Sequence, residues 1–162
     1  KIDISLGTLS KAAGVIGGFV TGAKNFIAYL RSKGRPFIFT TALPPAACAS
    51  AIEAIKIIRK NPDLRSQLWA KTDYIKNRLS TAGFDLQDSG SPIIPILIGD
   101  PHKTLKVSHD LWQNGFFIPA IRPPTVPAEK SRLRITITAM HTPKELDSLF
   151  NHLIKARERY GF

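Results

Sequence analysis

The stretch "GTLSKAAGVIGGF", residues 7–19, decides the fold of this chain, because it places one lysine among small residues. Before it, apolar and polar side chains alternate, which predicts a short half-buried strand from Lys1 to Leu6. Three glycines follow the lysine, at positions 14, 17 and 18. The pattern puts Lys11 at the end of an apolar strand, where the chain enters a glycine-rich turn.

Two phosphate-binding motifs that use glycine-rich turns are excluded by their spacing. A Walker-type loop needs Gly-Lys-Ser/Thr, whereas Ser10 precedes Lys11 and Ala12 follows it. A dinucleotide fingerprint needs G-x-G-x-x-G, and the glycines of this turn do not supply that spacing. Neither motif therefore explains the lysine.

A third role for Lys11, as a Schiff-base lysine, fits the composition of the turn. Such an amine needs a rigid, partly desolvated position with small neighbours, so that a flat cofactor can lie against the backbone. Residues 7–14 meet the steric requirement, and the hydroxyls of Thr8 and Ser10 could hold a phosphate. The pattern leaves two hypotheses open: a Schiff-base lysine, or a structural loop with an incidental lysine.

The composition limits the class of protein. The 162 residues fit one domain or parts of two, and a hydrophobic content of 43% is enough for a real core. The single cysteine, Cys48, rules out an internal disulfide and suits a reducing compartment, so we expect a cytoplasmic protein. The histidines are scattered and no apolar run has the length of a bilayer, so we expect neither a metal site nor a membrane partner.

The formal net charge of +11 has two interpretations. It could serve a nucleic acid or an anionic surface. It could also reflect solvated helix faces, because the lysines and arginines between residues 56 and 78 are interleaved with apolar positions. No motif of a nucleic-acid module accompanies the charge, which favours the second interpretation, and we expect no nucleic-acid partner.

Periodicity and turn residues predict the remaining elements. After the lysine turn we expect helix 23–32, strand 37–39 and a helix from Pro45 to Asn61. From residue 63 onward the expected order is helix, strand, helix, strand, strand, helix, over residues 64–83, 93–99, 105–112, 116–121, 132–139 and from Thr142 onward. The segment "RPPTVPAEKS", residues 122–131, is too rich in proline for either element and is expected to be a loop.

This order predicts two parts with a boundary near Asn61-Pro62. Residues 63–162 are expected to form a compact α+β domain with helices on one face of a small, largely antiparallel sheet. Residues 1–62 are expected to be the end of a separate, larger α/β layer. Because the chain starts with Lys1 directly in a strand-like pattern, we expect it to be a piece of a longer protein.

Three segments, "GTLSKAAGVIGGF", "FIFTTALPPA" and "IRPPTVPAEKSRLRITITAMHT", stand in the order and spacing of the α-oxoamine synthases. These are pyridoxal-phosphate (PLP) enzymes of the aspartate-aminotransferase fold, fold type I, which join an amino acid to an acyl thioester and release CO₂. The resemblance covers essentially this whole chain but only the carboxyl-terminal part of the family's length. It implies that residues 1–62 end the large PLP-binding domain and that residues 63–162 form the small α+β domain.

The resemblance also implies roles for five residues. Lys11 matches the family's Schiff-base lysine, and Thr8 matches a threonine that contacts the cofactor phosphate. Thr41 matches a threonine that reaches the phosphate of the other subunit across a homodimer interface. Thr125 matches a substrate-contacting threonine, and Arg134 matches an arginine that holds a substrate carboxylate, as a planar guanidinium does well. Without the resemblance, the favoured interpretation of Arg134 is a solvated strand arginine.

The segment at residues 122–127 most resembles the branch of the family that condenses L-alanine with a pimeloyl thioester in biotin synthesis. The acyl carrier is coenzyme A or acyl carrier protein. Alternatives are the sister enzymes that use glycine, 2-amino-3-oxobutyrate ligase and 5-aminolevulinate synthase, and a basic, non-catalytic binding module. Met140 and His141 are interpreted as packing residues, and Arg132 as structural.

The family's aspartate for the pyridinium nitrogen and its ring-stacking histidine have no counterpart in these segments. We therefore expect the 162-residue piece alone to be inactive.

Overall fold

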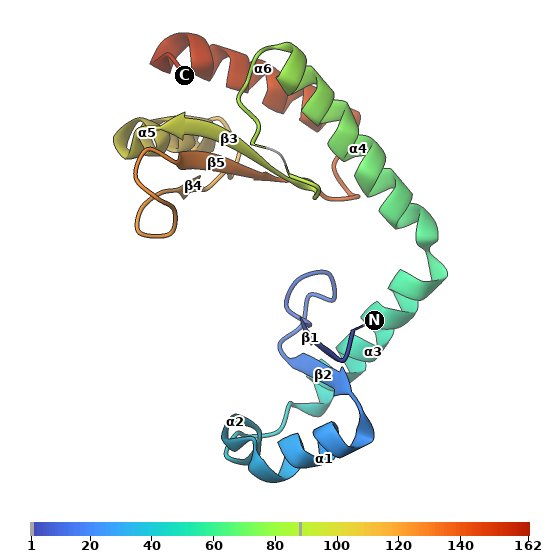
Figure 1. The fold of residues 1–162 in the computed structure, drawn as a ribbon. Helices are drawn as coiled ribbons and strands as arrows, with labels where there is room; N and C mark the ends of the chain where they lie inside the picture. The colour runs from blue at the N-terminus through green and yellow to red at the C-terminus, as the bar shows by residue number, and fades with distance from the viewer. Residues whose placement is uncertain (1, 88) are drawn as a thin grey trace. The chain divides into compact units, whose positions relative to one another are not determined.

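The computed structural model describes residues 2–87 and 89–162, and its ribbon is shown in Figure 1. The chain divides into two compact units, Lys1–Pro62 and Asp63–Phe162. Lys1, where the expected first strand begins, lies outside the described residues. That the first unit is the end of a larger PLP-binding domain, and the second a small domain, stays a prediction.

An antiparallel hairpin carries the lysine turn of the first unit. Strand β1 (Ile4–Thr8) pairs with β2 (Gly18–Gly22), and Gly7 stands opposite Phe19. The sequence predicts the first strand as half-buried, and this is wrong within this chain, since Leu6 is 79% exposed. A two-stranded hairpin has no second layer in this unit to cover its apolar face. The pairing partner β2 is not among the expected elements.

Two glycines of the hairpin are required by close approach and by backbone conformation. A Cβ at Gly7 would overlap the ring of Phe19, which lies across the opposite strand position. Gly17 has φ +122°, a conformation that L side chains rarely adopt, and a Cβ there would lie 2.9 Å from Leu43 Cδ1. The glycine-rich composition of the turn is thus a steric requirement of the hairpin.

Three helices complete the first unit: α1 (Lys24–Lys33), α2 (Arg35–Ile38) and α3 (Pro45–Lys60). The first and third confirm the expected helices. The expected strand 37–39 is wrong, because this segment forms the short helix α2 and its last turn. Pro36 fits the first helical turn, and the Gly34 carbonyl accepts hydrogen bonds from the Phe37 and Ile38 N–H groups at 2.9 and 3.0 Å.

The second unit follows the expected order of elements. These are α4 (Pro62–Thr81), β3 (Ile93–Gly99), α5 (Pro101–Gln113), β4 (Ala120–Ile121), β5 (Ser131–Thr136) and α6 (Pro143–Tyr160). The strands form an antiparallel sheet in the order β3-β5-β4. The expected strand 116–121 is too long, since only its last two residues pair. Pro119 has no N–H to donate to a ladder, and pairing starts at the residue after it.

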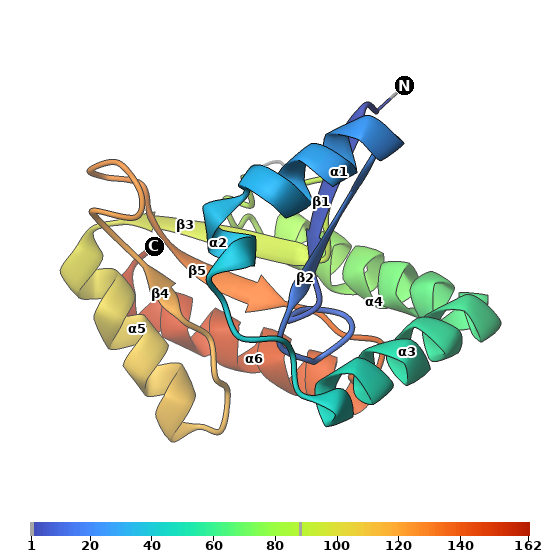
Figure 2. The same cartoon turned by 90° about the horizontal axis from the view of Figure 1, so that it is seen from below.

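The core of the second unit lies between the sheet and its three long helices. On β5 and the residue after it, Leu133, Ile135 and Ile137 are buried, while Arg134 and Thr136 are exposed. The buried face packs against apolar side chains of α4, α5 and α6, among them Ile75, Leu79, Val107, Leu111, Leu149 and Leu153. Figure 2 shows α5 and α6 running side by side along the sheet. The alternation predicted from the sequence therefore separates a covered face from an open one.

Helix α6 begins with a complete capping box at Thr142. The Thr142 hydroxyl accepts from the Glu145 N–H at 3.3 Å, and the Glu145 carboxylate accepts from the Thr142 N–H at 2.7 Å. Two hydrogen bonds lower the pKa of Glu145 from its ordinary value of 4.5. The larger effect comes from the Thr142 N–H and the next from the Thr142 hydroxyl.

We predict that the Thr142→Ala variant raises the pKa of Glu145 towards 4.5, because the hydroxyl no longer donates to the carboxylate. A folded-state pKa below the unfolded value means that Glu145 contributes stability above pH 4.5, which is lost as pH falls through the folded-state pKa. NMR titration of the Glu145 carboxyl measures the pKa. Thermal unfolding between about pH 6 and pH 3 measures the weaker acid dependence of the variant.

A control variant, Thr81→Ala, removes an exposed hydroxyl at the end of α4 and leaves the titration of Glu145 unchanged. An unchanged Glu145 titration in Thr142→Ala would show that the capping hydroxyl does not act on this carboxylate.

Candidate active site

Lys11 lies in the loop that joins β1 to β2. The loop is closed by hydrogen bonds from the Leu9 N–H to the Gly17 carbonyl at 2.9 Å and from the Val15 N–H to the Leu9 carbonyl at 3.0 Å. Within it, the Gly14 N–H donates to the Lys11 carbonyl at 3.0 Å. Strand β1 ends at Thr8, two residues beyond the expected strand end, and Lys11 lies in the turn that follows, as the sequence predicts.

Two hydroxyls gather around the lysine amine. Thr8 Oγ1 and Ser10 Oγ lie 2.8 Å apart, and Lys11 Nζ donates to Ser10 Oγ at 3.5 Å. Thr8 Oγ1 also accepts from the Ser10 N–H at 3.2 Å. The structure therefore brings together the three polar groups that the sequence analysis singled out in this turn.

This donor set fits a cofactor that carries an aldehyde and a phosphate. A primary amine reacts with an aldehyde, and two hydroxyls can donate to phosphate oxygens. The neighbours leave space, since a Cβ built at Gly14 would meet nothing within 4 Å. Lys11 itself is exposed in this unit, so the partial desolvation expected of a Schiff-base lysine is not found among the described residues.

Thr41 lies in the segment between α2 and α3 and is exposed. This segment reaches the lysine loop through Leu43, whose Cδ1 stands 2.9 Å from the position of a Cβ at Gly17. Thr41 itself makes no recorded hydrogen bond to the loop within the described residues. The structure therefore places the Thr41 segment beside the lysine loop.

Thr125 and Arg134 belong to the second unit. Thr125 lies in the proline-rich loop, where its N–H donates to the Arg122 carbonyl at 3.0 Å. Arg134 lies on β5, its side chain is exposed, and its N–H donates to the Pro119 carbonyl at 3.1 Å. In the part of the chain that the structure describes, no ion pair engages its guanidinium.

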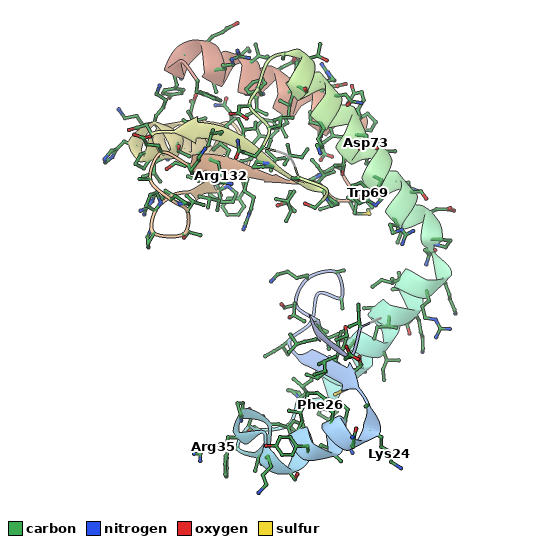
Figure 3. All side chains as sticks on the ribbon, viewed as in Figure 1. Lys24, Phe26, Arg35, Trp69, Asp73 and Arg132 are labelled. Carbon is green, nitrogen blue, oxygen red and sulfur yellow. The ribbon has the colours of Figure 1, made fainter. Side chains whose placement is uncertain are left out.

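The open face of the sheet surrounds Arg134. Its cross-strand partner is Pro95, and Arg132 and Thr136 share its face. Arg132 Nε donates to the Lys130 carbonyl at 2.9 Å, which agrees with its interpretation as structural. Figure 3 labels Arg132 on this sheet. The face thus presents one guanidinium that is tied to the backbone and one that is not.

The interpretation of Met140 as a packing residue is wrong, since its side chain is 81% exposed. Met140 lies in the turn between β5 and α6, beyond the strand whose alternate positions enter the core. His141 is half-buried, and its Nδ1 accepts from the Thr138 N–H at 3.2 Å.

Some kinds of site are absent from residues 2–87 and 89–162. No group of three or more His, Cys, Asp or Glu side chains is placed to hold a metal ion there. Within the same residues, every helix is too short or too polar to span a bilayer. Cys48 is free and exposed.

Comparison with known proteins bears on the whole chain. A curated 8-amino-7-oxononanoate synthase of Thermoanaerobacter pseudethanolicus is 46% identical over 161 residues, which cover 99% of this chain and 40% of the relative. The synthase of Treponema denticola gives the same identity and coverage. A solved structure of serine palmitoyltransferase (SPT) with PLP internal aldimine superposes with a TM-score of 0.93 at 30% identity, over 99% of this chain and 41% of SPT.

The chain therefore spans about 40% of the length of the curated relatives it matches. The expected fold class is confirmed, since the solved structure with the matching fold is a PLP enzyme of fold type I. The model of the family "Aminotransferase class I and II" matches residues 1–153. Because that match takes in the lysine turn, the proline-rich loop and β5, the chain belongs to the aminotransferase class I and II family.

Proposed function

We propose that this chain is part of an 8-amino-7-oxononanoate synthase. The whole protein condenses L-alanine with a pimeloyl thioester, on coenzyme A or acyl carrier protein, and releases CO₂ and the free thiol. The observation that carries the proposal is 46% identity to two curated synthases of that name over 161 residues. The identity to SPT, a serine palmitoyltransferase, is lower than to these two synthases, at 30%.

Lys11 is the catalytic residue in this proposal. Pyridoxal phosphate, when bound, supplies an electron sink that stabilises negative charge at the α-carbon of the amino acid. Lys11 Nζ would hold the aldehyde of the cofactor, and Thr8 together with Thr41 of the second subunit would hold its phosphate. Nζ would also remove the α-proton of the amino acid and return it. The hydroxyls beside Nζ support this assignment.

Arg134 binds the alanine carboxylate, and Thr125 contacts the substrate. The exposed guanidinium on the open face of β5 suits bidentate capture of a carboxylate. A rigid antiparallel strand between β3 and β4 limits where that guanidinium can point. Holding the carboxylate fixes the amino acid while its α-proton is removed.

The proposed setting is a cytoplasmic homodimer whose subunits share phosphate contacts through Thr41. The glycine-using sister enzymes remain the closest alternative, because they share the chemistry and differ in the substrate. Family membership favours an enzyme over the basic binding module that the net charge of +11 could suggest.

We predict that the complete protein containing this chain releases thiol from pimeloyl-CoA when alanine is present, and that Lys11→Ala abolishes this release while the fold survives. Only a primary amine at this position can both anchor the aldehyde and move the proton. Thiol release with alanine, glycine and serine measures the choice of substrate, and borohydride reduction followed by mass spectrometry locates the cofactor on Lys11.

The matched control is Lys24→Ala, which removes an exposed lysine at the start of α1 and leaves turnover unchanged. A preference for glycine or serine over alanine would reject the biotin-pathway assignment. Appreciable turnover by Lys11→Ala would reject the role of the lysine.

We predict that Arg134→Ala weakens alanine binding by tenfold or more with little effect on cofactor binding. Hydrogen bonds to charged groups contribute about 1.5–3 kcal/mol, and this variant removes one from the carboxylate. Titration of the cofactor absorption with alanine measures the affinity. An unchanged titration curve would contradict the role, and Arg132→Ala, at the neighbouring position tied to the Lys130 carbonyl, serves as the comparison.

We predict that a chain limited to these 162 residues neither binds pyridoxal phosphate tightly nor catalyses the condensation. It spans about 40% of the curated relatives, and the hairpin that carries Lys11 leaves its apolar side chains uncovered. Co-expression with the rest of the protein restores both properties. Absorption spectra with added cofactor and alanine-dependent thiol release measure them, and turnover by the isolated chain would show that the missing groups are not needed.

A further inference from the structure

The ladder between β5 and β3 ends at Thr136, so in the part of the chain that the structure describes no strand pairs with residues 138–142 of the loop between β5 and α6. The Ile137 N–H still donates to the Pro92 carbonyl at 3.0 Å, which is the last backbone hydrogen bond to the segment preceding β3. After it, exposed and half-buried positions alternate, and the His141 N–H donates to the Thr138 carbonyl at 3.4 Å, until Thr142 caps α6. The position of this loop therefore depends on side chains rather than on a ladder.

Three side chains hold backbone groups of the loop. Lys71 Nζ, from α4, donates to the Ala139 carbonyl across 68 positions of sequence. His141 Nδ1 accepts from the Thr138 N–H at 3.2 Å, and Glu145 accepts from the Thr142 N–H at 2.7 Å. Of these contacts, only that of Lys71 ties the loop to a distant element. Trp69 and Asp73, two residues to either side of Lys71, mark its place on α4 in Figure 3.

On one side, the loop borders a cavity and is not held by packed side chains. A cavity of about 300 Å³ borders it, with Thr136, Ile137, His141 and Glu145 in its lining. Side chains that face a cavity give little resistance to movement in that direction. Without the Lys71 contact, the loop has room to shift.

The loop continues the strand that carries Arg134. Arg134, Thr136 and Thr138 are all exposed, and they alternate with the buried positions of the same segment. The guanidinium has no ion-pair partner within the described ranges, so the strand backbone, which sets the position and direction of the Cα–Cβ bond, is what fixes the base of this side chain. A shift at residues 138–139 reaches Arg134 through the intervening backbone.

We propose that Lys71 is a positioning residue: by holding the Ala139 carbonyl, it keeps the end of β5 in place and thereby aims Arg134 at the substrate carboxylate. This inference rests on the proposed role of Arg134. Lys71 is half-buried and directly precedes the fully buried Thr72 on α4, so its ammonium gives up part of its hydration to make this contact. Lys71 acts through Arg134 and touches no substrate.

The experiment compares Lys71→Met with Lys76→Met in the complete, cofactor-loaded protein. Met keeps the apolar stem of the side chain and removes the donor. Lys76 is the matched control, because it also lies on α4 and donates to a loop carbonyl, that of Ser89, at 2.8 Å. Lys71→Arg, which keeps a charged donor, tests for rescue.

Two ligands separate positioning from general damage. Alanine carries the carboxylate that Arg134 holds, whereas ethylamine has the same amine and lacks the carboxylate. Lys71→Met is expected to lower the apparent affinity for alanine roughly threefold to tenfold and to leave that for ethylamine unchanged, since a misaimed guanidinium weakens only the carboxylate contact. Hydrogen exchange of residues 137–142, followed by mass spectrometry, is expected to be faster in this variant.

Each of the following results would overturn the inference: unchanged alanine affinity in Lys71→Met, an equal loss for ethylamine, or an equal loss in Lys76→Met. If Lys71→Met does not fold, His141→Ala decides, because it releases the Thr138 N–H of the same loop and is expected to show the same selective loss. Arg134→Ala, measured in parallel, distinguishes failure of the proposed function from failure of the positioning role alone. A normal alanine titration in that variant rejects the proposed function as well, whereas a weakened one beside a normal Lys71→Met rejects only the positioning role.

Discussion

The second unit depends on the burial of one face of β5. Leu133, Ile135 and Ile137 pack into the core that α4, α5 and α6 cover, and the same alternation leaves Arg134 outside. Because side chains of a strand alternate with period two, slipping the register by one residue would bury the guanidinium and expose the leucine. The hydrophobic packing that stabilises the unit is thus also what presents its proposed substrate-binding residue.

The first unit is governed by a different constraint, the close approach of backbones in a glycine-rich hairpin. Its apolar side chains are mostly uncovered, so the lysine loop is shaped by hydrogen bonds between Leu9, Gly17 and their neighbours rather than by a core. Polar groups near Lys11 Nζ follow from that backbone, since Thr8 and Ser10 lie on one side of the turn. In the second unit, the packing of the core therefore also presents the proposed substrate-binding residue, whereas in the first unit the hydrogen-bonded loop positions the lysine without a core.

The sequence was most informative where local signals and burial agree. The capping residue Thr142 and the proline at the start of α3 predict helices that the structure contains. It failed at α2, where an apolar triplet resembled a strand although Pro36 fits a helical turn. The exposure of β1 could not be predicted, because alternation indicates which face is apolar and not whether anything covers it.

The candidate site divides in the same way. Small residues around Lys11 could be read directly as space for a flat cofactor, whereas Thr41, Thr125 and Arg134 are single exposed residues without a pattern and entered through the family resemblance. Lys71 was missed because its contact with Ala139 joins positions 68 residues apart, which no local signal reports. The hairpin pair Gly7 and Phe19 carries a consequence for sequence variation: since a Cβ at position 7 would overlap the ring opposite, a side chain at position 7 requires a smaller residue at position 19, whereas a smaller residue at 19 leaves glycine at 7 acceptable.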